Sequence, residues 1–210
     1  MSRPQIAVVD YGAGNILNVL RALEYLEVQP QLVSAPESVS AADGIVIPGV
    51  GAFGAGMRGL RSTGMDQALR ESVVEGIPIL AICLGMQLLA SSSEESPAEN
   101  GLNLIPGKVL KLGTSTASPA RVPDTGWASV TFSRSTLGVS AGDTRDFYFS
   151  HSYYFSPTDR AVVSGSKIRE SAEVPVLLEH NNIVAAQFHP EKSGKEGISL
   201  LQSWIQNCKP

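Results

Sequence analysis

A single cysteine separates two apolar segments of different type in PILAICLGMQLLA, residues 78–90. The segment before Cys83 is continuously apolar, as in a buried strand, and the segment after Gly85 has the apolar spacing of a helix. A nucleophile on a tight turn between a strand and a helix forms a nucleophile elbow, which aims the side chain out of the sheet. Backbone N–H groups at the start of the helix can then hold an oxyanion. The alternative is that Cys83 is a small apolar core residue.

A thiol nucleophile needs a base, and the chain contains three histidines. His189 follows an apolar strand in AAQFHPEKSG, and the proline after it favours an extended backbone. Because residues two apart in an extended chain point to the same side, Glu191 can orient the imidazole of His189. The alternative is a turn with two solvated polar side chains. We expect His180, in LEHNNI, to lie in a hairpin turn, and His151, in FYFSHSYYF, to be a core or pocket residue.

Alternating strands and helices are expected to position these residues. The strands predicted in the first half are 5–10, 31–35, 44–49 and 78–83, and the helices are 16–26, 64–74 and 84–90. Nearly continuous apolar strands in this rhythm indicate a parallel sheet with helices on both faces. After Leu102 short strands and turns indicate antiparallel pairing, and a helix from Gly194 to about Asn207 follows. The expected fold is α/β, with a mostly parallel central sheet and antiparallel strands in the C-terminal half.

Two segments are predicted to be loops. The glycine-rich PGVGAFGAG, residues 48–56, lacks the Gly-Lys-Ser/Thr ending of a phosphate-binding loop, as does YGAGN. A loop whose backbone approaches or flips toward a substrate carbonyl is the preferred interpretation of residues 48–51. The polar, turn-rich SSSEESPAENG, residues 91–101, is predicted to be a surface loop.

Composition excludes several classes of function. The 210 residues, 43% hydrophobic and 17% charged, suit one globular domain spanning 1–210. A net charge of −4 without a basic stripe argues against nucleic-acid binding, and no apolar run approaches the roughly 20 residues that span a membrane. The N-terminus has no signal-peptide pattern. Cys83 and Cys208 give no disulfide framework and indicate a cytoplasmic setting, and the histidines and cysteines have no metal-ligand spacing.

The pair CLGMQLL and QFHPE resembles the signature of class I, triad-type glutamine amidotransferases. DYGAGNILNV, IPGVGAFGAGM, Gly126-Trp127, FYFSHSYY and AAQFHPEKSG, in that order, resemble one branch, the glutaminase subunit of imidazole glycerol phosphate synthase. The resemblance covers nearly the whole chain. It implies glutamine as substrate, no cofactor or metal, and a (β/α)8-barrel cyclase as heterodimer partner. The partner would use the ammonia to make imidazole glycerol phosphate and aminoimidazole carboxamide ribotide in histidine synthesis.

The resemblance also implies a role for particular residues. Cys83 would attack the glutamine carboxamide, His189 would act as acid and base, and Glu191 would orient His189. The oxyanion hole would combine the N–H of Leu84 with one from the loop of Gly49, Val50 and Gly51. The residues that seat glutamine would be Gln87 and the backbone of Ser152 and Tyr153. In this family the glycine-rich loop must rearrange first, which implies little activity without the loaded partner.

The partner-facing positions implied by the resemblance are Asn15, Trp127, Tyr148 and Lys192. Each has a simpler alternative: a helix cap for Asn15, core positions for the two aromatic residues, and a solvated charge for Lys192. The family usually has Pro-x-Met-Gly-Trp-Asn around the tryptophan, whereas this chain has PDTGWA at 123–128, with Asp124, Thr125 and Ala128. The departures alter the expected partner contact and leave the expected triad intact.

Two rival functions are open from the sequence. One is the glutaminase subunit of another triad amidotransferase, of the pyridoxal phosphate synthase or anthranilate synthase type. The other is a non-catalytic scaffold that only supports a partner, although an intact Cys83, His189 and Glu191 argue against it. Cys208 has no nearby candidate base in the sequence and is interpreted as incidental.

Overall fold

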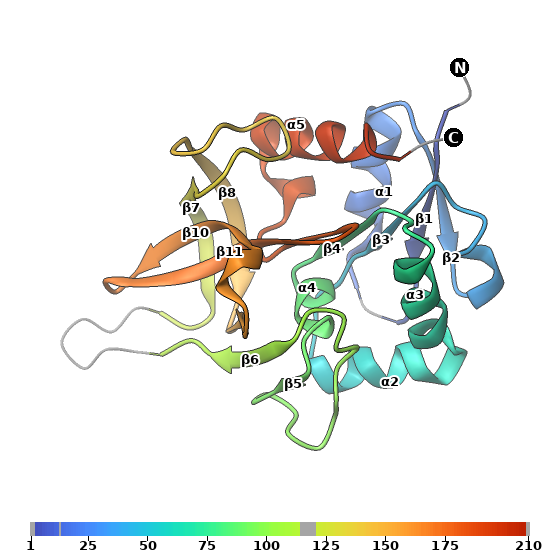
Figure 1. The fold of residues 1–210 in the computed structure, drawn as a ribbon, viewed down its shortest axis with the longest axis horizontal. Helices are drawn as coiled ribbons and strands as arrows, with labels where there is room; N and C mark the ends of the chain where they lie inside the picture. Colours follow the sequence, from blue (N-terminus) through green and yellow to red (C-terminus); the bar gives the residue numbers. More distant parts are fainter. Residues whose placement is uncertain (1–2, 13, 114–120, 209–210) are drawn as a thin grey trace.

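The structure, a computed structural model, describes residues 3–12, 14–113 and 121–208. Within these residues nine strands form the main sheet in the order β2-β1-β3-β4-β12-β11-β10-β7-β8 (Figure 1). The first five are mutually parallel: β2 (Gln29–Val33), β1 (Gln5–Val9), β3 (Gly44–Ile47), β4 (Ile79–Ile82) and β12 (Ile183–Ala186). The other four continue antiparallel: β11 (Ala172–His180), β10 (Val163–Arg169), β7 (Asp124–Phe132) and β8 (Thr144–His151). The predicted fold class is confirmed.

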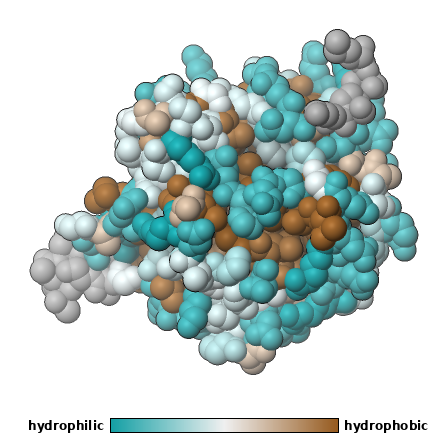
Figure 2. Space-filling model, in the orientation of Figure 1, coloured by the Kyte–Doolittle hydropathy of each residue, from teal (hydrophilic) through white to brown (hydrophobic). Residues whose placement is uncertain are grey.

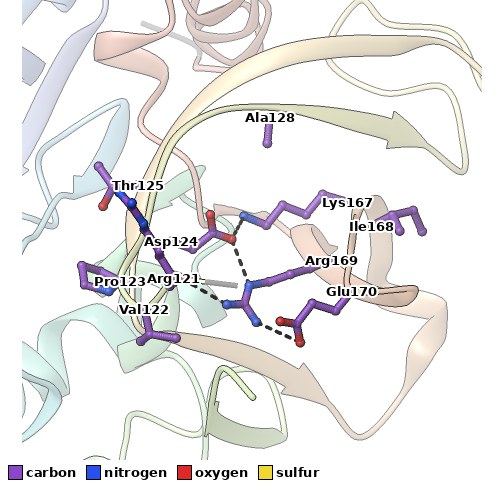
Figure 3. Close-up of a pocket in the computed structure, with 10 residues that line it drawn as sticks. All are labelled: Arg121, Val122, Pro123, Asp124, Thr125, Ala128, Lys167, Ile168, Arg169 and Glu170. Carbon is purple, nitrogen blue, oxygen red and sulfur yellow. Dashed lines mark hydrogen bonds and ion pairs between the residues drawn. The ribbon is translucent and has the colours of Figure 1, made fainter. Parts of the chain in front are cut away.

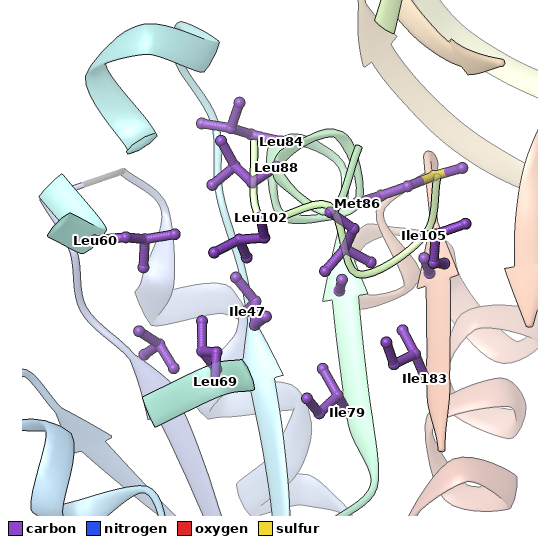
Figure 4. Close-up of a cluster of buried hydrophobic side chains, with 14 of the residues drawn as sticks. Ile47, Leu60, Leu69, Ile79, Leu84, Met86, Leu88, Leu102, Ile105 and Ile183 are labelled. Atoms are coloured by element: carbon purple, nitrogen blue, oxygen red, sulfur yellow. The ribbon is translucent and has the colours of Figure 1, made fainter. Parts of the chain in front are cut away.

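Helices cover both faces of the parallel part of the sheet (Figure 1). One face carries α2 (Phe53–Thr63), α3 (Met65–Val74) and α4 (Leu84–Leu88), and the other carries α1 (Ile16–Tyr25) and α5 (Gly194–Ile205). In β3, Ile45 and Ile47 point into the first layer and Val46 into the second, and all three are fully buried. Figure 4 shows the first of these cores, where side chains of α2, α3 and α4 meet those of β3, β4 and β12. Burial on both faces explains why these strands are continuously apolar.

A small second sheet lies beside the main one in the order β5-β6-β9. Its strands are β5 (Ser92–Ser93), β6 (Gly107–Lys111) and β9 (Tyr153–Pro157). Three short 3-10 helices complete the described elements: Pro36–Ser38, Arg160–Val162 and Pro190–Lys192. The aromatic stretch FYFSHSYYF is therefore split at Ser152, with β8 in one sheet and β9 in the other.

The prediction of a loop over 48–56 is wrong in its second half, because α2 begins at Phe53. Glycine lowers helix propensity by about 1 kcal/mol, so the sequence of this segment argued against a helix. The structure shows what these glycines permit. A Cβ on Gly59 would lie 2.1 Å from the carbonyl oxygen of Tyr11, and one on Gly56 would lie 3.1 Å from Leu88. The glycines let α2 pack directly against the backbone that follows β1.

Segment 91–101 also differs from the predicted surface loop. Ser92 and Ser93 pair with β6, and Ser93 is buried. The carboxylate of Glu95 accepts a 2.7 Å hydrogen bond from the N–H of Phe53, at the first turn of α2. This segment therefore joins the small sheet to α2.

The molecular surface is mixed in character. Figure 2 shows hydrophilic residues over most of the visible face, with apolar residues exposed in its middle. Among the described residues, no helix is both long enough and apolar enough to cross a membrane.

Candidate active site

Cys83 occupies the strained corner between β4 and α4. Its backbone has φ 53° and ψ −105°, a combination that residues with a side chain rarely adopt. Its N–H donates 2.7 Å to the carbonyl of Ala186, so β4 remains tied to β12 up to the corner. Gly85 permits the turn, since a Cβ there would lie 1.9 Å from the carbonyl oxygen of Ile47. These contacts build a nucleophile elbow, in which Ala81 stands where the usual Gly-x-nucleophile-x-Gly pattern has its first glycine.

His189 and Glu191 form a buried pair next to this corner. His189 has an extended backbone, with φ −102° and ψ 94°, and the short helix Pro190–Lys192 follows it. Its Nδ1 lies 2.8 Å from Oε1 of Glu191, and both side chains are only 2% exposed. The main chain is fixed as well, because the N–H of His189 donates to the carbonyl of Tyr148 at 2.9 Å. The spacing of two residues thus gives one polar unit.

The other ring nitrogen of His189 remains available. Among the described residues, Nε2 of His189 has no hydrogen-bond partner although it is buried. Burial lowers the pKa of His189, but the neighbouring Cys83 sulfur and Glu191 carboxylate outweigh it and raise this pKa to about 9. The Cys83 thiol donates weakly to the carbonyl of Ser150, at 3.9 Å. The Cys83 sulfur is thus a neighbour of His189, whose Nε2 the described residues leave unpaired.

The predicted oxyanion residues lie beside Cys83, but one of their donors is occupied. The N–H of Leu84 donates to the carbonyl of Gly49 at 3.2 Å. The Tyr11 hydroxyl donates to the adjacent Pro48 carbonyl at 2.5 Å, and burial raises the pKa of Tyr11 well above its usual range. Gly51 has φ 132°, a backbone conformation that favours glycine. In this conformation the loop presents a carbonyl, rather than an N–H, to the oxyanion position.

A cavity of about 170 Å³ opens beside the Cys83 sulfur. It is smaller than the roughly 300–1,000 Å³ typical of drug-sized ligands, so it suits a metabolite of amino-acid size. The residues that line it are Val50, Gly51, Cys83, Leu84, Gln87, Glu95, Pro123, Ser150, His151, Ser152 and Tyr153. The cavity therefore brings together the predicted nucleophile, the oxyanion loop and the three predicted glutamine-binding residues.

The predicted glutamine-binding residues are already engaged with the protein. Nε2 of Gln87 donates at 3.0 Å to the Tyr153 carbonyl and at 3.0 Å to the side-chain oxygen of Gln187. The Ser152 carbonyl accepts from the N–H of Leu112 at 2.9 Å. These contacts fix the cavity wall formed by the start of β9.

Three cavity-side residues escaped the sequence analysis in full or in part. Glu95 lies in the segment taken for a surface loop, and no local pattern marks it. Gln187 is fully buried and places its amide nitrogen 3.6 Å from the Cys83 sulfur. Its position two residues before His189 was the available signal, since alternate residues of an extended segment share a side. His151 is both buried and part of the cavity lining.

Three of the four positions predicted to face a partner gather on one surface. The Trp127 side chain is 60% exposed, which excludes the alternative of a core position for it. Its ring meets Tyr148 edge-on at 6.2 Å, and the ammonium of Lys192 lies 5.8 Å from the Tyr148 ring centre. Asn15 is exposed at the start of α1 in the left-handed region, and within the described residues its side chain makes no capping hydrogen bond. Asn15 therefore stands at the N-cap position of α1, as the alternative supposed, but its side chain does not cap the helix.

The remaining reactive side chains lie elsewhere. Cys208 is buried under α5, where burial raises its pKa to about 12, and His180 ends β11 beside the hairpin turn. In the described part of the chain, no three His, Cys, Asp or Glu side chains gather as metal ligands would.

Comparisons with known proteins agree with this geometry. The family model "Glutamine amidotransferase class-I" matches residues 7–207. Imidazole glycerol phosphate synthase subunit HisH of Herpetosiphon aurantiacus is 43% identical over 96% of this chain and 93% of its own length. HisH of Chlorobaculum tepidum is 40% identical over 96% and 99%, and HisH of Methanothermobacter thermautotrophicus is 37% identical over 96% and 98%.

Solved structures share the fold at lower identity. A crystal structure described as a glutamine amidotransferase has a TM-score of 0.75 at 20% identity and covers 96% of this chain and 98% of its own. The PurLQS structure from Thermotoga maritima has a TM-score of 0.77 at 18% identity, covering 99% and 100%. The chain belongs to the class I glutamine amidotransferase family and, within it, to the HisH glutaminase subunits of imidazole glycerol phosphate synthase.

Proposed function

We propose that this chain hydrolyses glutamine to glutamate and ammonia with a triad of Cys83, His189 and Glu191. The observation that carries the proposal is the strained Cys83 corner beside the buried 2.8 Å pair of His189 and Glu191, with Nε2 of His189 left for the thiol. A nucleophile, a base and a group that orients the base are the three parts that acyl transfer requires.

The reaction follows from these positions. The Cys83 thiol gives its proton to Nε2 of His189, which the raised pKa of His189 favours, and the resulting thiolate bonds to the carboxamide carbon of glutamine. His189 then protonates the departing nitrogen, the C–N bond breaks, and ammonia leaves a glutamyl thioester. Water attacks the thioester and gives a proton to His189, the C–S bond breaks, and Cys83 regains its proton as glutamate departs. Glu191 holds the ring through Nδ1 and stabilises the imidazolium in both steps.

The oxyanion needs donors that this conformation does not offer. We propose that the peptide between Gly49 and Val50 turns over, which removes the Gly49 carbonyl from Leu84 and directs the N–H of Val50 to the oxyanion. The N–H of Leu84 is then a second donor, and each such donor is worth about 10²–10³-fold in rate. We therefore expect low glutaminase activity before this rearrangement, because the oxyanion then lacks its donors.

Glutamine would lie in the 170 Å³ cavity, along the backbone of Ser152 and Tyr153 and against Gln87. Among the described lining residues, Glu95 supplies a carboxylate, and we assign it to the α-ammonium group of glutamine. The match in size, and the negative charge of Glu95 opposite an ammonium group, support this assignment.

The ammonia would pass to a (β/α)8-barrel cyclase, bound as a heterodimer on the surface of Trp127, Tyr148 and Lys192, with Asn15 also in contact. Exposure of a large aromatic side chain supports this surface, since aromatic residues are enriched at interfaces. Residues 1–210 would act as one amidotransferase domain, supported by the family match to 7–207. A reducing cytoplasm suits the proposal, because Cys83 must be a free thiol, as it is in the described structure.

The test is glutamate release from glutamine in three mixtures: the chain alone, with a cyclase barrel, and with the barrel and its nucleotide ligand. We expect a large increase only in the third. Cys83→Ala should abolish the glutamine-dependent synthesis and spare synthesis from added ammonia. Equal loss of both would contradict the role of Cys83, and no glutamate release in any mixture would favour a non-catalytic scaffold.

A further inference from the structure

Lys167 is a buried cation on β10 that the proposed reaction does not use. Its side chain is only 2% exposed, whereas lysine is almost never buried without a partner. Its ammonium lies 2.7 Å from the carboxylate of Asp124 and 3.8 Å from the centre of the Phe149 ring. Figure 3 shows Lys167 and Arg169 converging on the Asp124 carboxylate, and all three residues line a cavity between β7 and β10.

A second contact of Lys167 reaches the glutamine cavity. Its Nζ lies 3.2 Å from Nε2 of His151, and Nδ1 of His151 lies 2.8 Å from the carbonyl oxygen of Tyr153. Ammonium groups only donate hydrogen bonds and carbonyl oxygens only accept them. The ring must therefore accept at Nε2 and donate at Nδ1, so both neighbours select the same tautomer of His151.

From Tyr153 the hydrogen bonds continue to the sulfur. The Tyr153 carbonyl also accepts from Gln87, whose amide nitrogen donates to the oxygen of Gln187 at 3.0 Å. Because Gln187 accepts through its oxygen, its nitrogen is the atom that faces Cys83, at 3.6 Å. A carbonyl that can only accept thus fixes the orientation of two buried amides.

Every side chain between the ion pair and the sulfur is shielded from water. His151 and Gln87 are 5% exposed, and Gln187 is fully buried. Burial and the charge of Lys167 lower the pKa of His151 to about 4, so its ring stays neutral at physiological pH. A neutral ring with a defined tautomer is what this arrangement requires.

We propose that Lys167, with Asp124 as counterion, is a positioning residue of the glutaminase: it fixes the His151 tautomer and thereby the Tyr153 carbonyl that orders Gln87 and Gln187 around Cys83. The inference rests on the proposed function and adds to it residues that do not touch the substrate. It also gives Asp124 a role, as the counterion of a buried lysine.

The experiment measures how fast Cys83 of the full-length chain is alkylated by two reagents. Diazo-oxo-norleucine resembles glutamine and needs the amino-acid cavity, whereas iodoacetamide needs only an accessible thiol. Lys167→Met keeps the side-chain volume and removes the donor and the charge. We expect the half-saturating concentration of diazo-oxo-norleucine to rise about tenfold, because a cavity wall that Lys167 no longer holds must be ordered when the reagent binds. The iodoacetamide rate should change by less than about twofold, because iodoacetamide needs only an accessible thiol and does not use the contacts of the amino-acid cavity.

Arg145→Met is the matched control. Arg145 lies at the other end of the strand that carries His151 and pairs with Asp143 and Glu196 at the surface. The Arg145→Met variant also loses one cation, and we expect both of its alkylation rates to equal those of the wild type. If Lys167→Met does not fold, Lys167→Met combined with Asp124→Asn removes the unpaired charge, and the same tenfold rise is expected.

The tautomer gives a readout that a merely supporting role would not change. With three histidines in the chain, ¹⁵N spectra resolve His151 after assignment with His180→Gln and His189→Gln. The wild type should show a protonated Nδ1, and Lys167→Met a mixture of tautomers. An unchanged His151 spectrum, an unchanged half-saturating concentration, or equal slowing of both reagents would overturn the role of Lys167. A wild-type chain that diazo-oxo-norleucine does not label, even with the cyclase, would instead overturn the proposed function.

Discussion

Glu191→Gln tests the triad where its geometry is tightest. The substitution keeps the shape of the side chain and removes its charge, and Oε1 of Glu191 lies 2.8 Å from Nδ1 of His189 in a site only 2% exposed. His189 becomes an imidazolium each time it takes a proton, from Cys83 in the first step and from water in the second. The carboxylate stabilises that cation, whereas an amide of the same shape can only accept a neutral hydrogen bond.

The expected loss follows from the hydrogen bond. Bonds to charged groups contribute about 1.5–3 kcal/mol, and 1.36 kcal/mol is tenfold in rate. Since Glu191 helps to raise the pKa of His189 to about 9, the variant should also have a lower pKa at this ring. We therefore expect kcat for glutamine hydrolysis to fall by between about tenfold and about 150-fold, with little change in KM.

The assay is glutamate release by the chain with the cyclase and its ligand, together with synthesis from added ammonia. Ammonia-dependent synthesis should be unchanged, because only ammonia supply is impaired. Glu179→Gln is the matched control, since it alters a partly buried carboxylate at the end of β11 that borders a different cavity. A decrease below about threefold, or an equal decrease in Glu179→Gln, would refute the assignment of Glu191 as the group that stabilises the imidazolium.

Three further predictions concern stability and association. Gly59→Ala should lower the free energy of unfolding by about 3 kcal/mol, or about 6–12 °C in melting temperature, because the new methyl would lie 2.1 Å from the Tyr11 carbonyl oxygen. Helix propensity alone predicts a rise in melting temperature, and such a rise would contradict the packing of α2 against Tyr11. A histidine with a raised pKa stabilises the folded state below its unfolded pKa of about 6.5, and this is lost as pH rises through about 9. The wild type should thus lose melting temperature relative to His189→Gln between pH 6.5 and 9, and parallel curves would count against the raised pKa. Trp127→Ala should change the free energy of unfolding by less than about 1 kcal/mol, because the side chain is exposed, and should weaken cyclase binding about 30-fold. Calorimetry measures the affinity, and an unaltered affinity would show that Trp127 is not in the interface.

The parts of the fold that rest on local patterns were predictable. Buried parallel strands are continuously apolar, so β1, β3 and β4 stood out, and the change to helical spacing after Gly85 marked the corner at Cys83. The helix α2 was missed because its glycines lower helix propensity, and their compensation is contact with Tyr11, a residue distant in sequence. A close approach between remote segments leaves no local signal.

The same distinction holds within the site. His189 and Glu191 were predictable together, because two residues of one extended segment share a side. The contacts of Lys167 with Asp124 and His151 join residues 43 and 16 positions apart, and nothing near any of them specifies the pairing. The occupied N–H of Leu84 likewise depends on the conformation of a loop, which its glycines leave undetermined in the sequence.

The edge of the main sheet has a consequence for solubility. The strand β8 is the last in the sheet, and both outward backbone groups of Tyr148 are satisfied by the segment from His189 to Ser193: its carbonyl by the N–H of His189 and its N–H by the Ser193 hydroxyl at 2.9 Å. An uncovered edge strand is a template for pairing with other chains. Substitutions that loosen this segment should therefore promote aggregation as well as loss of the proposed activity, so that precipitation during expression would report damage to the candidate active site.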